Sequence, residues 1–317
     1  MDIPHKLKNK AKMVKQKKRA QDFFASCHSK QILDDEIVCL AAYIDAAKLI
    51  FNDRSVSKSI ASEILFLENL QDLNPRLKYQ LKLYLEITKY LAINHKNKGD
   101  YQNNIEHFKL TNSLIKTPVL VIAGGASLMD ESTLEAYNEF FIELMHGFEG
   151  TIISGGTTAG IPGMVGAIKT KTEKKGTLDF SLIAYLPHEL PPDATRSLAY
   201  DHFYETESTH FSALDILSYW CDLIGNRINP ADVFLIGIDG GSLAALEYRI
   251  ALSVGAKVGL MTHSGRAVDD LLQDNKWKNY PNLILLPENP VEACGLIKKS
   301  IKRYYPNKIL LLFIGIA

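Results

Sequence analysis

The chain has 317 residues, of which 46% are apolar and 23% charged, and its 36 Asp and Glu residues balance its 36 Lys and Arg residues. This composition is that of a soluble globular protein, and the length allows two domains or one domain with a large extension. Because the formal net charge is zero, no overall field attracts the chain to nucleic acid or membrane. We expect no nucleic-acid partner, and membrane contact only through the chain ends.

The N-terminus is locally basic, because residues 1–20 carry seven Lys and one Arg against one Asp. Such a run is either the solvated face of a helix or a contact for an acidic partner or lipid headgroups. It has no apolar signal-peptide core. The four cysteines, Cys27, Cys39, Cys221 and Cys294, form no CxxC pair and suggest neither a disulfide framework nor a metal site. We therefore expect a cytoplasmic protein without a bound metal.

Residues 1–115 contain almost no glycine, and their apolar residues recur at helical spacing. The clearest helical face consists of Ile37, Leu40, Ala41, Ile44, Ala47 and Ile50. A second helical pattern follows the start signal Asn74-Pro75. These patterns predict an all-α N-terminal region over residues 1–115, to which we assign oligomerisation or contact with a partner.

Short apolar runs that end in glycine alternate with helical stretches from Thr117 onward. The strand-sized runs are TPVLVIAGGAS, GTIISGGTTAG, FSLIAYLP, ADVFLIGIDGG, AKVGLMTHSG and NLILLPEN. Apolar strands that alternate with helices are typical of a parallel sheet covered on both faces. The pattern predicts an α/β domain over residues 116–306 with a Rossmann-like, doubly wound parallel sheet, and residues 190–220 are expected to form a long loop across its ligand edge.

The last ten residues, KILLLFIGIA, are strongly apolar but shorter than the about 20 residues that span a bilayer. We interpret residues 307–317 as an edge strand or a buried terminal segment. The alternative is a transmembrane helix that the given chain cuts short.

Three glycine-containing turns follow predicted strands, and small residues there allow a ligand to approach backbone N–H groups. Their candidate ligand-binding residues are Gly124, Gly125, Ser127, Ser154, Gly155, Gly156, Thr157, Thr158, Asp239, Gly240, Gly241 and Ser242. Ser242 is also a candidate cap for the helix that follows. Each turn alone is better explained by a backbone that needs positive φ. Because all three lie at one predicted edge of the sheet, a ligand cradle is the better interpretation.

Further candidates lie near these turns. Glu247 is placed to bind ribose hydroxyls or an exocyclic amine, although a surface or structural salt bridge with Arg249 is the alternative. Ser264, Gly265 and Arg266 offer a hydroxyl, a flexible turn and a guanidinium that can grip phosphate. Arg196 is a candidate contact from the long loop.

Several common catalytic motifs are absent from the sequence. It contains no HExxH metal motif, no GxSxG nucleophile elbow, no GxxxxGK[ST] phosphate loop and no GxGxxG after the first predicted strand. These absences argue against a zinc protease, a serine hydrolase, a P-loop NTPase and an ordinary dehydrogenase.

The ordered motifs VIAGGAS, IISGGTTAGIPGMVGAI, FLIGIDGGSLAALEYRIALSVGAKVGLMTHSGRA and NLILLPEN resemble the prokaryotic LSDAT branch of the SLOG superfamily. This superfamily includes the ligand-sensing region of TRPM channels and the LOG-type phosphoribohydrolases. The resemblance covers residues 117–300. It implies a Rossmann-like sensor, in which the three glycine turns cradle the ligand and Glu247 takes an acidic helix position.

The ligands that the resemblance implies are a nucleotide or a NAD-derived molecule, such as ADP-ribose or cyclic ADP-ribose, or a cyclic nucleotide, with no required cofactor. It also implies a role in bacterial anti-phage defence, with an effector protein as a further partner; we expect self-association into a homo-oligomer. LOG-type hydrolases resemble PGGxGTxxE at the third turn, whereas Leu243 and Ala244 replace the Gly-Thr pair here. This departure favours binding over hydrolysis. The alternative is a nucleotide N-glycosidic hydrolase in which Glu247 is catalytic.

Overall fold

The computed structural model describes residues 36–51, 74–96, 114–125, 135, 137–173 and 179–301. The basic run at residues 1–20, Ser127 and the apolar segment 307–317 lie outside these ranges. None of the helices within them is both long and apolar enough to span a membrane.

A seven-stranded parallel sheet forms the centre of the α/β part, with the order β4-β3-β2-β1-β5-β6-β7. Its strands are β1 (Val119–Gly124), β2 (Glu149–Ser154), β3 (Asp179–Pro187), β4 (His202–Thr206), β5 (Val233–Ile238), β6 (Lys257–Met261) and β7 (Leu283–Leu286). Six of them are the apolar runs recognised in the sequence. The predicted doubly wound, Rossmann-like α/β fold is therefore confirmed.

The prediction of a long loop over residues 190–220 is wrong in two places. Residues His202–Thr206 form β4, which pairs in parallel with β3 at one edge of the sheet. Helix α8 (Ala213–Gly225) begins before the expected loop ends, and Ser212 and Asp215 form a capping box at its start. An edge strand does not need apolar residues on both faces, so its mixed sequence resembles a loop.

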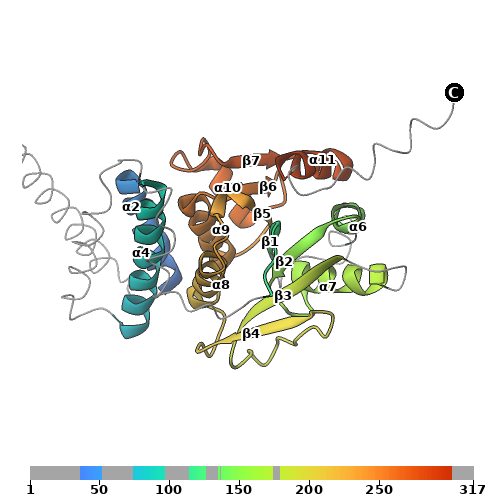
Figure 1. The fold of residues 1–317 in the computed structure, drawn as a ribbon, viewed down its shortest axis with the longest axis horizontal. Coiled ribbons are helices and arrows are strands. Elements are labelled where there is room, and N and C mark those ends of the chain that lie inside the picture. The colour runs from blue at the N-terminus through green and yellow to red at the C-terminus, as the bar shows by residue number, and fades with distance from the viewer. Residues whose placement is uncertain are drawn as a thin grey trace, which may run out of the picture.

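Helices cover both faces of the sheet (Figure 1). On one face lie α6 (Asn138–Met145), α7 (Gly160–Glu173) and α11 (Pro290–Ser300). On the other lie α8, α9 (Ser242–Val254) and α10 (Arg266–Gln273), and a short 3-10 helix, η3 (Pro230–Asp232), leads into β5. Along β1, Val119 and Val121 point toward α8 and α9, whereas Leu120 and Ile122 point toward the opposite helices. Alternate side chains of one strand thus contribute to two apolar cores.

Two helices of the N-terminal region add a further layer outside α8 and α9 (Figure 1). They are α2 (Glu36–Phe51) and α4 (Pro75–Lys96), which confirm the helical patterns predicted for these stretches. Leu40 and Ile44 of α2 and Leu81 of α4 are fully buried in the same apolar cluster as residues of α8 and α9. The described helices of the N-terminal region therefore share a core with the α/β part.

The strand order creates a crevice between β1 and β5. The chain runs from β1 through β2 and β3 to β4 on one side, and then crosses through α8 to β5 on the other side of β1. Connections that leave two adjacent strands in opposite directions mark a topological switch point, where open α/β sheets bind their ligands. All three predicted glycine turns follow strands at this carboxyl edge.

Candidate functional site

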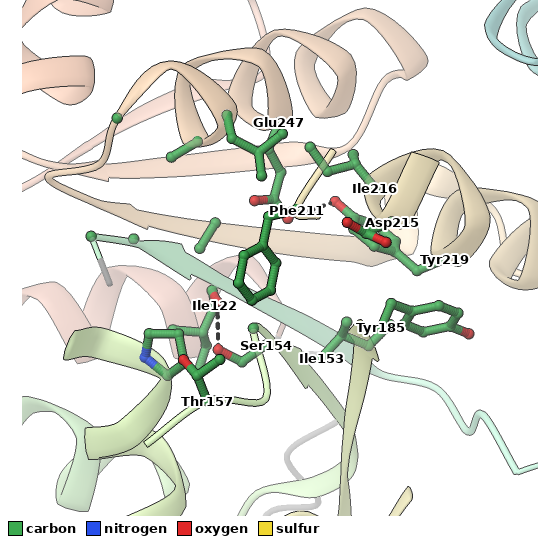
Figure 2. Close-up of a pocket in the computed structure, with 18 of the residues that line it drawn as sticks. Ile122, Ile153, Ser154, Thr157, Tyr185, Phe211, Asp215, Ile216, Tyr219 and Glu247 are labelled. Atoms are coloured by element: carbon green, nitrogen blue, oxygen red, sulfur yellow. Dashed lines mark hydrogen bonds between the residues drawn. The ribbon is translucent and has the colours of Figure 1, made fainter. Parts of the chain in front are cut away.

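A cavity of about 270 Å³ opens at the switch point. It extends inward from the carboxyl ends of β1 and β2, between the sheet and helices α8 and α9 (Figure 2). The predicted site residues that line it are Gly124, Gly125, Ser154, Gly155, Thr157, Gly241, Glu247 and Arg266. Gly156, Thr158, Arg196, Asp239, Gly240, Ser242, Ser264 and Gly265 are not among the residues that line it.

Most of the glycines at this edge are required by the fold itself. A Cβ on Gly124 would lie 2.7 Å from the Ile238 carbonyl oxygen, and one on Gly155 would lie 2.8 Å from Pro162 Cγ. Gly156 and Gly240 have φ values of +74° and +102°, in the region that favours glycine. The need for glycine at these positions is thus explained by packing and backbone conformation without a ligand.

Gly241 differs from the other turn glycines. Its φ is −95°, which any residue adopts, and a Cβ there would meet no atom of the described part of the chain within 4 Å. The fold does not require a glycine at this position, yet Gly241 lines the cavity. Its missing side chain keeps space open at the cavity mouth.

Gly241 is also the N-cap of α9, and no side chain among the residues that the structure describes caps this helix. The prediction that Ser242 supplies the cap is wrong, because the helix begins at Ser242 itself, one residue earlier than a Ser242 cap would allow. The first N–H groups of a helix have no partner within the helix and favour an anion. The mouth of the cavity therefore offers backbone donors at the start of α9.

Arg266 is the one residue with a cationic side chain among the described residues that line the cavity. Its guanidinium donates two hydrogen bonds to the Asp239 carboxylate, one from Nε to Oδ1 at 2.8 Å and one from Nη2 to Oδ2. Asp239 is buried, and its backbone N–H donates to Ser264 Oγ at 2.8 Å. Asp239 and Ser264 thus position Arg266, and Gly125 makes room for the ion pair because a Cβ there would lie 2.5 Å from Asp239 Oδ2.

Two hydroxyl residues of the second turn line the cavity on the β2 side. Ser154 Oγ donates to the Ile122 carbonyl oxygen at 2.8 Å, which ties the end of β2 to β1 (Figure 2). The Thr157 hydroxyl is buried and has no hydrogen-bond partner within the described part of the chain. Buried polar atoms are normally paired, so this hydroxyl is a candidate ligand contact.

Arg196 is held away from the cavity. Its Nη2 donates to Glu205 Oε1 at 2.7 Å, and its guanidinium lies 4.8 Å from the ring centre of Phe203. An isolated antiparallel bridge joins Arg196 to Thr157, and Thr158 N–H donates to the Thr195 carbonyl. Arg196 and Thr158 therefore hold the loop before β4 against the second turn.

Glu247 lies in the inner part of the cavity, where Tyr219 Oη donates to its Oε1 at 3.0 Å (Figure 2). Burial raises the pKa of Glu247 to about 7, and the nearby Asp215 adds to the rise. Burial also raises the pKa of Asp215 to about 6, although Thr206 and the Ser212 N–H partly offset this effect by hydrogen bonding. Two carboxyl groups with raised pKa values therefore lie in one cavity.

The walls of the inner cavity include residues that the sequence interpretation missed. They are Tyr185 from β3, Phe211 before α8, and Asp215, Ile216 and Tyr219 on α8. The SxxD capping box at Ser212–Asp215 was the signal that a helix begins there. With the start of α8 placed, Asp215 and Tyr219 fall on one helical face, four residues apart.

No protein-family model and no curated protein matches the sequence. Among solved structures, the molybdenum cofactor carrier protein of Chlamydomonas reinhardtii is 17% identical with a TM-score of 0.41, covering 58% of this chain and 98% of that chain. A molybdenum cofactor binding protein from the phototrophic bacterium Rippkaea orientalis is 18% identical with a TM-score of 0.37, covering 58% and 97%. These similarities are too distant to transfer a ligand or an activity to this chain.

Proposed function

We propose that the chain binds a small nucleotide-derived molecule and acts as its sensor. The observation that carries the proposal is the cavity at the switch point, which joins backbone donors at the start of α9 to an apolar interior with carboxyl groups. Small-molecule sites are typically concave, largely apolar and equipped with a few convergent polar groups. The ligand class follows from the LSDAT resemblance and includes ADP-ribose, cyclic ADP-ribose and cyclic nucleotides.

The two parts of the cavity suit the two parts of a nucleotide. The uncapped start of α9 and the guanidinium of Arg266 suit a phosphate, and the walls formed by Tyr185 and Phe211 suit a flat ring. The volume of about 270 Å³ is close to the lower end of about 300–1,000 Å³ for small-molecule sites. It therefore suits a mononucleotide, or one half of a larger ligand, better than a whole dinucleotide.

The cavity walls also provide a route by which binding is sensed. Helices α8 and α9 contribute Tyr219 and Glu247 to the cavity and pack against α4 and α2 on their other sides. Leu243 and Ala244 line the cavity where LOG-type hydrolases resemble Gly-Thr, which favours retention of the ligand over its cleavage. We propose that the ligand acts on the helical N-terminal region, on self-association or on an effector protein.

The binding proposal is tested by replacing Gly241, whose Cβ position is open and whose φ is permissive. Melting temperatures are measured with NAD, ADP-ribose, cyclic ADP-ribose, cyclic nucleotides and nucleoside monophosphates. Gly241→Leu is expected to weaken binding of the active ligand at least tenfold, equivalent to about 1.4 kcal/mol. Gly295→Leu is the matched control, because Gly295 lies in α11, away from the cavity, and its Cβ position is also open. The absence of a melting shift with every ligand would contradict the proposal.

A second candidate function is hydrolysis of an N-glycosidic bond. It is favoured by Glu247, because a carboxyl group with a pKa near 7 is suited to general acid or base catalysis at neutral pH. Mass spectrometry of each ligand after incubation distinguishes the two candidates. Release of a free base by the native protein, lost in Glu247→Gln while binding is kept, would identify an enzyme; intact ligand in both identifies a sensor.

A role in anti-phage defence and the formation of a homo-oligomer belong to the same proposal. Light scattering after gel filtration, with and without the active ligand, measures whether the ligand changes self-association. Expression of the chain with its genomic neighbours in phage-challenged cells tests the defence role, with Gly241→Leu as the binding-deficient control.

A further inference from the structure

The inner end of the cavity is a separate chemical environment from its mouth. Glu247 lies six residues beyond Gly241, which places it about 9 Å further along the axis of α9 at 1.5 Å per residue. Asp215 and Tyr219 reach the same end from α8 (Figure 2). A ligand anchored at the mouth therefore presents its far end to these three residues.

The hydrogen-bond donors at the inner end are already used. The hydroxyl group of Tyr219 donates to Glu247 Oε1 at 3.0 Å, and that of Tyr185 donates to Asp222 Oδ2 at 2.7 Å. Phe211 and Ile216 have no polar side-chain atoms. The side chains that line this end thus offer a ligand acceptors rather than donors.

The hydrogen-bond acceptor that remains available to a ligand at the inner end belongs to Glu247. Its Oε1 receives the Tyr219 hydroxyl, and no residue in the described part of the chain donates to its Oε2. The oxygens of Asp215 are held by Thr206 Oγ1 at 2.5 Å and by the Ser212 N–H at 2.8 Å, so this carboxyl group is fixed in place. Glu247 is therefore the group whose second oxygen a ligand can reach.

The negative charge at the inner end of the cavity also favours a hydrogen-bond donor on the ligand. This charge comes from the carboxyl groups of Asp215 and Glu247. The one cation among the described lining residues, Arg266, is paired with Asp239 and does not neutralise them. Carboxylates that are partly removed from water lose hydration, and a ligand donor restores part of what was lost. A carbonyl oxygen, carboxylate or phosphate in the same place would be repelled.

We propose that this end of the cavity selects an amino-substituted nitrogen heterocycle, with Glu247 accepting a hydrogen bond from the amino group and Asp215 adding negative charge. The aromatic walls at Phe211 and Tyr185 cover the ring. This inference rests on the proposed function, since it assigns the orientation and the ring chemistry of the nucleotide-derived ligand. Glu247 and Asp215 are then the residues that determine specificity.

The experiment compares ligands that carry the amino group with analogues in which a hydrogen or an oxo group replaces it. Calorimetric titration at pH 8, above the raised pKa values of about 7 for Glu247 and about 6 for Asp215, measures AMP against purine riboside monophosphate and against IMP, CMP against UMP, and the free base adenine against purine and against hypoxanthine. The amino member of the best-binding pair is expected to bind at least tenfold more tightly, because a site built to bind N–H groups rejects an analogue that leaves its acceptor unpaired. Glu247→Gln is expected to reduce this preference to less than threefold, whereas Glu292→Gln, on the exposed start of α11, leaves it unchanged.

Equal affinity of the native protein for both members of every pair would overturn the inference while leaving the proposed function standing. A preference that persists unchanged in Glu247→Gln would overturn the assignment of Glu247. Binding of adenine over hypoxanthine without binding of any nucleotide would support the inference and contradict the proposed function. If none of these probes binds, the inference is overturned, whereas the proposed function is contradicted only if NAD, ADP-ribose, cyclic ADP-ribose and the cyclic nucleotides also give no melting shift.

Discussion

The carboxyl group of Glu247 is held by the fold in an environment that favours its neutral form. Its pKa rises from 4.5 to about 7, chiefly because burial removes hydration. The folded protein therefore keeps a proton that the unfolded chain releases near pH 4.5. The contribution of this group to folding is most favourable below pH 4.5, and it is lost progressively as the pH rises toward 7. Asp215 acts in the same direction over a narrower range, because its pKa rises from 3.8 to about 6.

Replacing Glu247 by Gln should remove this pH-dependent loss and still accept the Tyr219 hydroxyl. At pH 8 we expect Glu247→Gln to have a larger free energy of unfolding than the native protein, by on the order of 3 kcal/mol, because the pKa of Glu247 rises from 4.5 to about 7 and each pKa unit corresponds to about 1.36 kcal/mol. At pH 5 the difference should be small. Urea denaturation at both pH values measures the effect, and a variant less stable at pH 8 would show that Glu247 is ionised without cost.

At the residue scale, the sequence made the outer part of the site predictable but left part of its interior unrecognised. Gly124, Gly155 and Glu247 were recognisable because glycines at strand ends and an acidic residue in the next helix follow a known spacing. Asp215 was missed because the mixture of aromatic and hydroxyl residues around it hides the start of α8. The pairing of Arg266 with Asp239 was also unpredictable, since positive φ at Asp239 and a contact between residues 27 apart leave no periodic signal.

At the scale of elements, Asp45 connects α2 to the α/β part. Its Oδ1 accepts from Trp277 Nε1 at 2.7 Å and from Arg249 Nε at 3.3 Å, and its Oδ2 accepts from Lys276 Nζ at 3.1 Å. Trp277 is fully buried, and its indole N–H donates to this carboxylate from the core. One residue of α2 thus contacts both α9 and the chain segment that follows α10.

Asp45→Ala should loosen the docking of α2, because it removes the carboxylate to which Trp277 Nε1 and Arg249 Nε donate. We expect a loss of about 2–4 kcal/mol in the free energy of unfolding. Hydrogen exchange should become faster in Glu36–Phe51 and less affected in the central strands. Lys276→Ala is the control, since its side chain is 59% exposed and its ion pair should contribute little. Unchanged exchange in α2 would contradict this role of Asp45.

The strands that could be predicted are those with continuous apolar sequences, including the edge strand β7, three of whose four residues are at least partly exposed. β1 and β5 consist of apolar residues and glycine throughout, with Gly124 at the end of β1 and Gly237 next to last in β5, so composition alone identifies them. β4 reads HFYET and lies at the sheet edge, with four of its five residues at least partly exposed. At the scale of elements, the success of the prediction therefore depended on an unbroken apolar sequence, which β4 lacks.

At the scale of the whole molecule, α2 and α4 complete the core of α8 and α9 rather than forming a separate cluster. Leu77, Leu81 and Leu85 of α4 are fully buried, and Tyr84 Oη donates to Ser253 Oγ of α9 at 2.9 Å. Helical periodicity predicted that residues 36–51 and 74–96 form amphipathic helices. It did not reveal which surface they cover, because docking between distant segments leaves no periodic signal in the sequence.

A chain that lacks residues 1–115 should therefore expose the apolar surface of α8 and α9 that α2 and α4 cover. We expect this shortened chain to aggregate or to melt at a lower temperature than the full chain, as exposed apolar patches promote association. Gel filtration and thermal denaturation measure this, and co-expression of residues 1–115 as a separate chain should partly restore solubility. A shortened chain with an unchanged melting temperature would establish residues 116–317 as an autonomous unit.

The ion pair between Asp239 and Arg266 means that an anionic ligand enters as a competitor. The guanidinium of Arg266 already donates to the Asp239 carboxylate. A phosphate can therefore bind Arg266 only if it shares the guanidinium with Asp239 or displaces Asp239 from it. Asp239 lies three residues before the first residue of α9, Ser242, so an exchange of partners at Arg266 acts on the short turn that leads into that helix. A ligand bound at the cavity mouth would then shift the turn before α9. Helix α9 packs against α2, so the shift would reach the N-terminal region.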